Sequence, residues 1–146
     1  KALQISDKLG PILKRLIQVQ VDLKKYESAI EYSLQATRDY PNDPDIYYNV
    51  AVLYQNLGVN TYNSVRSKWD KTNNEEYTDI QVLNSIYDEF KIARKYFSEA
   101  KDYFLEVTDL NIDDQTSHKG AKEMKRMIKQ LDEIFIPSIR KRIEKN

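Results

Sequence analysis

The stretch from Pro44 to Gly58 constrains the fold more than any other part of the chain. Its apolar residues recur at helical spacing, and its two ends suit a helix, since proline is tolerated at a first helical position and glycine commonly follows a last one. No charged residue occurs between Ile46 and Val65, although 32% of the chain is charged. We therefore expect a helix that contacts neighbours on more than one side, as the central helix of a stacked array.

The composition indicates one helical domain. A chain of 146 residues has the length of a single domain, and its 3 glycines and 4 prolines allow few tight turns. With 23 residues of each charge sign and a pI near 6.8, the chain lacks the basic excess typical of nucleic-acid binders. The charge-free stretch is too polar to insert into a membrane. The absence of cysteine leaves cytoplasm and periplasm equally open.

Periodic apolar residues predict a series of helices. We expect them at about 11–24, 26–40, 44–58, 77–110 and 116–135, with the third pattern continuing beyond Gly58 toward Trp69. The longest run, 77–110, implies one helix of more than about 30 residues, or two with a kink. A turn is expected at Lys71–Asn74. Pro137 is expected to end the last long helix, leaving 138–145 as a short basic turn or helix.

An internal repeat underlies these helices. Placing residues 2–24 over 36–58, a shift of 34, aligns Leu16 with Val50 and Ile17 with Ala51. Self-similarity at this period is the signature of tetratricopeptide repeats. The aromatic, small, small and proline positions of that repeat are matched by Tyr26, Ala29, Ala36 and Pro41. The chain thus resembles a tetratricopeptide repeat (TPR) protein from residue 1 to about residue 58.

The resemblance implies an all-α fold in which antiparallel helix pairs stack as a right-handed solenoid. Within a single domain over 1–146, residues 1–9 end a preceding repeat, 10–43 form a repeat, 44–112 form a second repeat with an insertion of about 37 residues, and 113–146 form a capping helix and a basic tail. We interpret the insertion as a protruding helical hairpin. Its unequal arms imply a kink or a helix end at Gly58. A bacterial TPR subgroup has such a hairpin, and we expect the chain to be the C-terminal part of such a protein.

TPR arrays bind extended peptides or partner helices in a concave groove lined by the first helix of each pair. The resemblance therefore implies a non-catalytic scaffold that binds an unidentified protein or peptide partner through this groove or through the protruding hairpin. No nucleic-acid partner is expected. Carried over by helical phase, the groove residues are Lys14, Gln18, Asp22, Tyr48, Asn49, Val52, Gln55, Asn56, Lys119, Glu123 and Arg126. The amides of Asn49, Gln55 and Asn56 are suited either to a peptide backbone or to neighbouring helices, and both interpretations stay open.

Two other functions compete with the scaffold. The first is self-association into a homo-oligomer through the hairpin from Val59 to Lys95, which carries Trp69, Tyr77 and Phe90. The second is catalysis by carboxylates or by a metal at Asp113, Asp114 and His118. The sequence has no phosphate-binding loop and no nucleophilic triad, and a single histidine beside two acids is an incomplete ligand set. We therefore expect no enzyme activity, no cofactor and no metal.

Overall fold

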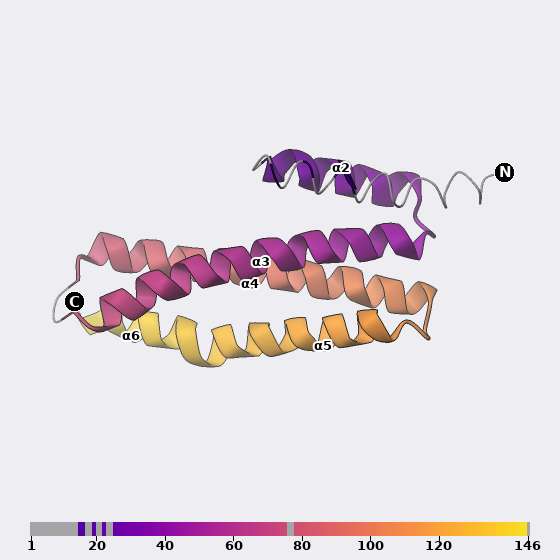
Figure 1. Cartoon of the computed structure of the whole chain (residues 1–146). Coiled ribbons are helices and arrows are strands. Elements are labelled where there is room, and N and C mark those ends of the chain that lie inside the picture. The colour runs from indigo at the N-terminus through magenta and orange to yellow at the C-terminus, as the bar shows by residue number, and fades with distance from the viewer. Residues whose placement is uncertain (1–14, 17–18, 20–21, 23–24, 76–77, 146) are drawn as a thin grey trace. The chain divides into compact units, whose positions relative to one another are not determined.

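The computed structural model describes residues 15–16, 19, 22, 25–75 and 78–145 (Figure 1). Its elements are α2 (Tyr26–Asp39), α3 (Pro44–Asn73), α4 (Ile80–Leu110), α5 (Gln115–Gln130), a π-helical turn η1 (Leu131–Phe135) and α6 (Ile136–Lys145). These ranges contain no strand, so the predicted all-α class is confirmed. Most of the helix predicted at 11–24 lies outside them. None of the described helices is both long and apolar enough to cross a membrane.

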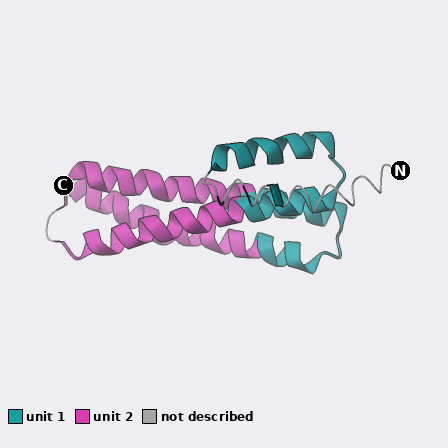
Figure 2. Ribbon diagram, turned by 45° about the horizontal axis from the view of Figure 1, so that its top comes forward, with its two compact units in different colours: residues 1–53, 100–121 teal, residues 54–99, 122–146 magenta. Residues whose placement is uncertain are grey.

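The chain divides into two compact units, and α3, α4 and α5 each contribute to both (Figure 2). Unit 1 comprises residues 1–53 and 100–121. Unit 2 comprises residues 54–99 and 122–146. The long run predicted at 77–110 is a single helix, α4, of 31 residues.

Unit 1 is built on small residues and aromatic rings. Ala29, Ser33 and Ala36 form the buried face of α2, as its helical spacing predicts. Between the start of α3 and the end of α4, the Tyr48 ring meets Phe104 edge-on at 6.0 Å. A Cβ added at Gly120 of α5 would lie 2.8 Å from the Phe104 ring, so glycine lets α5 approach α4 closely.

Unit 2 consists of three neighbouring helical segments: the second half of α3, the first half of α4, and the continuous run from residue 122 of α5 through η1 to α6. The first two form an antiparallel hairpin, joined by an ion pair between Lys68 Nζ and Glu89 Oε1 at 2.8 Å. The third covers this hairpin, because the Phe135 ring of η1 stacks on Phe90 at 5.2 Å and meets Tyr62 edge-on at 5.7 Å. The hairpin of these two arms therefore does not stand free.

Gly58 does not end the third helix, contrary to one of the two sequence interpretations. The helix α3 continues through Gly58 to Asn73. Glycine is needed there because an added Cβ would lie 2.7 Å from the ring of Phe97, which is fully buried on α4. The helix α3 ends at Asn73 and the turn follows at Asn74, the last residue of the predicted 71–74, so the two arms are nearly equal in length.

Pro137 does not end the last helix either, and that prediction was wrong. A proline inside a helix lacks the N–H that its turn requires and usually breaks or kinks the helix. Here the π-helical turn η1 precedes it, and the Ile136 N–H donates to the Leu131 carbonyl five residues back. The Ser138 hydroxyl then donates to the carbonyl oxygen of Ile134 at 2.5 Å. The helix resumes as α6, and π turns of this kind recur at functional sites.

Candidate functional site

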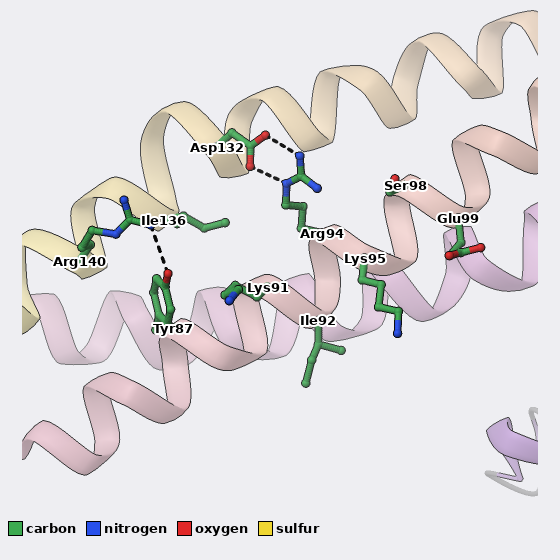
Figure 3. A pocket seen from close by; sticks show the side chains of 10 residues that line it. All are labelled: Tyr87, Lys91, Ile92, Arg94, Lys95, Ser98, Glu99, Asp132, Ile136 and Arg140. Atoms are coloured by element: carbon green, nitrogen blue, oxygen red, sulfur yellow. Dashed lines mark hydrogen bonds and ion pairs between the residues drawn. The ribbon is translucent and has the colours of Figure 1, made fainter.

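A groove of about 700 Å³ lies in unit 2 between α4 and the run from η1 to α6 (Figure 3). We call it the basic groove. It is lined by Tyr87, Lys91, Ile92, Arg94, Lys95, Ser98 and Glu99 of α4, Asp132 of η1, and Ile136 and Arg140 of α6. Its volume falls in the range of roughly 300–1,000 Å³ that is typical of binding pockets. The groove is open to solvent and would not enclose a small molecule. Its shape is better suited to the side chains of a docked protein segment.

Two polar contacts join its walls. Arg94 and Asp132 form a bidentate ion pair, with Nε to Oδ1 at 2.6 Å and Nη2 to Oδ2 at 2.9 Å. Asp132 raises the pKa of Arg94 by accepting these bonds. Arg140 donates to the Tyr87 phenolic oxygen at 3.2 Å and thereby lowers the pKa of Tyr87. Both contacts run between α4 and the third segment, so they hold the walls in register.

The charge of the groove is positive. Asp132 is neutralised by Arg94, which leaves Lys91, Lys95 and Arg140 opposed by Glu99 alone. The Lys91 ammonium lies 5.4 Å from the centre of the Tyr87 ring, and within the described residues neither Lys91 nor Lys95 forms an ion pair. Beside these cations, Ile92 is 46% exposed. The groove therefore presents cations around an accessible apolar side chain.

The other side of α6 is basic as well. A smaller hollow of about 360 Å³ is lined by Trp69 and Asn73 of α3 and by Ser138, Lys141, Arg142 and Lys145 of α6. Arg142 donates to the carbonyl oxygen of Glu75 at 2.7 Å, which ties α6 to the connection after α3. Cations thus flank α6 on both sides, as the basic tail in the sequence indicates.

The groove predicted from the TPR resemblance has members in both units and stays a prediction. In unit 1, Asp22 and Lys119 are exposed, while Tyr48, Asn49 and Val52 are half-buried. Lys14 and Gln18 lie outside the described residues. Tyr48 is engaged with Phe104, so its ring packs against α4.

In unit 2, the predicted groove members are Gln55, half-buried, and Asn56, Glu123 and Arg126, which are exposed. Arg126 Nε donates to Glu123 Oε2 at 3.0 Å, and this bond lowers the pKa of Glu123. These two side chains therefore neutralise each other. None of the predicted residues is among those that line the basic groove.

Both competing interpretations stay predictions, and the structure describes most of the residues that they name. Among the hairpin aromatics, Trp69 and Phe90 are buried, and Tyr77 lies outside the described residues. At the possible metal site of Asp113, Asp114 and His118, Asp114 Oδ1 accepts the Ser117 N–H and His118 Nε2 donates to the Ile112 carbonyl. Across the described part of the chain, no group of three or more His, Cys, Asp or Glu side chains is placed to hold a metal ion.

Sequence reasoning missed the basic groove because its walls are far apart in the chain. Asp132 and Arg140 meet residues of α4 only after the third segment folds onto the hairpin. One local signal was available. Ile92 falls outside the periodic apolar face of α4 and is flanked by Lys91 and Lys95. Single exposed apolar residues are ordinary, so this signal alone does not identify a groove.

Comparisons of the chain with protein-family models, with curated proteins and with solved structures found no match.

Proposed function

We propose that the chain is a non-catalytic protein-interaction module whose basic groove binds a segment of a partner protein. The observation that carries the proposal is the exposed Ile92 beside Lys91, Lys95 and Arg140 in an open groove of about 700 Å³. An apolar contact ringed by charges gives both affinity and orientation to a docked segment. The groove lies on the second arm of the hairpin that the sequence pattern had indicated as a docking element.

The proposal includes a TPR-like solenoid architecture. Its support is the spacing of buried residues. Ala29 and Ala36 on α2 are seven residues apart, and Ala100 and Val107 on α4 repeat this spacing. Stacked helix pairs of this kind carry extended binding surfaces because each repeat adds surface without closing a core. Under this interpretation the third segment of unit 2 both caps the array and forms one wall of the groove.

The test is a selection of random displayed peptides on the whole chain, followed by affinity measurements with variants. We expect Ile92→Glu to weaken the selected peptides roughly 10–100-fold, because it removes the burial of one large apolar side chain. Val82→Glu is the matched control, since Val82 is on α4, is also 46% exposed and does not line the groove. Equal affinity of the peptides for wild type and the Ile92 variant would refute the proposal.

A further inference from the structure

We propose that the segment bound in the basic groove is the α4–α5 loop of a second copy of this chain. Residues 109–114, which are the last two residues of α4 and the loop that follows it, are called the acidic loop. The inference rests on the proposed function, because it assigns a partner to the same groove.

The acidic loop carries negative charges beside exposed apolar side chains, and so complements the positive charges of the groove. Ile112 is 76% exposed, the most exposed of the large apolar side chains in the described residues, and Leu110 beside it is 39% exposed. Asp109 and Asp113 flank them, and both are exposed. A single exposed isoleucine is ordinary on a protein surface. Here the exposed isoleucine lies in a sequence with acidic neighbours, which complements an accessible Ile92 in a groove with lysines.

The loop is also held in shape before any contact forms. His118 Nε2 donates to the Ile112 carbonyl at 2.8 Å. The Asp113 N–H donates to Asn111 Oδ1 at 3.3 Å, and the Asp114 N–H donates to the Asn111 carbonyl at 3.1 Å. A preorganised loop loses little conformational entropy on binding, so more of the contact energy appears as affinity.

The charge distribution favours the same pairing. The net charge of the chain is zero, yet α4 after residue 100 and the acidic loop are predominantly acidic, while residues 122–145 are predominantly basic. Two copies therefore attract each other when the acidic loop of one approaches the basic groove of the other. Acid-to-base contact uses different surfaces on the two copies, so the association is heterologous, and it forms rings or open chains.

The test is sedimentation velocity of the whole chain over a range of concentrations at low ionic strength. We expect concentration-dependent association that weakens as salt is added. Ile112→Asn is expected to weaken it about tenfold or more, because the apolar side chain is lost from the contact. Val82→Asn is the matched control on an exposed apolar site outside the groove and is expected to associate as wild type does.

Mixing two variants makes the test specific to a heterologous contact. Lys91→Glu/Lys95→Glu disables the groove and Ile112→Asn weakens the loop, so each variant alone is expected to be monomeric at concentrations where the wild type associates. Mixed, they are expected to form dimers that grow no further, because one functional groove and one functional loop remain. Adding Asp109→Lys/Asp113→Lys to the groove variant is expected to restore self-association.

Two results would overturn the inference. A wild-type chain that stays monomeric at every concentration, while still binding selected peptides through Ile92, would show that the groove serves another protein. The proposed function would then stand without this partner. Association that the groove and loop variants leave unchanged would place the self-contact elsewhere.

Discussion

Phe135→Ala is expected to lower the free energy of unfolding of unit 2 by about 3–5 kcal/mol. Its ring is 6% exposed, lies between Phe90 and Tyr62, and carries the Arg66 guanidinium 4.8 Å from its centre. Removing it leaves a cavity where all three segments of unit 2 meet. Urea unfolding followed by fluorescence measures this directly, because the only tryptophan, Trp69, is buried in unit 2.

The control for this experiment is the preceding residue. Ile134 is 54% exposed, so Ile134→Ala is expected to change the free energy of unfolding by no more than about 0.5 kcal/mol. A Phe135→Ala effect as small as this control would mean that the third segment is not packed on the hairpin. The basic groove, which needs that packing, would then have no second wall.

Gly58→Val is expected to destabilise unit 2 by about 1–3 kcal/mol through overpacking. Its new Cβ would already lie 2.7 Å from two carbons of the Phe97 ring, and that ring is fully buried and cannot move into solvent. The measurement is again urea unfolding. Asn60→Val, at an exposed site two residues further along α3, is the control and is expected to change stability little.

A double-mutant cycle with Phe97→Ala identifies the cause. Phe97→Ala alone is expected to cost about 3–5 kcal/mol, and it opens space for the valine. The double variant is therefore expected to be more stable than the sum of the single effects predicts, by at least about 1 kcal/mol. Strictly additive effects would show that the two residues do not touch and that Gly58 has a different role.

The sequence predicted helices well where periodicity alone decides them. The apolar face of α4 is continuous from Leu83 to Val107, so one long helix follows from local spacing. Glycine and proline were harder to interpret, because each occurs both at helix ends and inside helices. Gly58 has the sequence signature of a helix stop, yet it permits a close approach to Phe97. Pro137 is accommodated by a π turn that no simple spacing predicts.

The basic groove was beyond sequence reasoning for a different reason. Its residues share no local pattern, and the Arg94–Asp132 and Tyr87–Arg140 contacts join positions that only tertiary packing brings together. The TPR resemblance directed attention to the first helices of the repeats.

The central claim is that a partner segment binds the basic groove, and isoleucine methyl NMR tests it most directly. The whole chain, labelled at isoleucine methyl groups, is titrated with a peptide selected on the wild-type protein. The account predicts that the largest shifts fall on Ile92 and Ile136, which line the groove, and that Ile30 and Ile46 of unit 1 change little. Shifts centred on Ile46, with Ile92 and Ile136 unchanged, would contradict it.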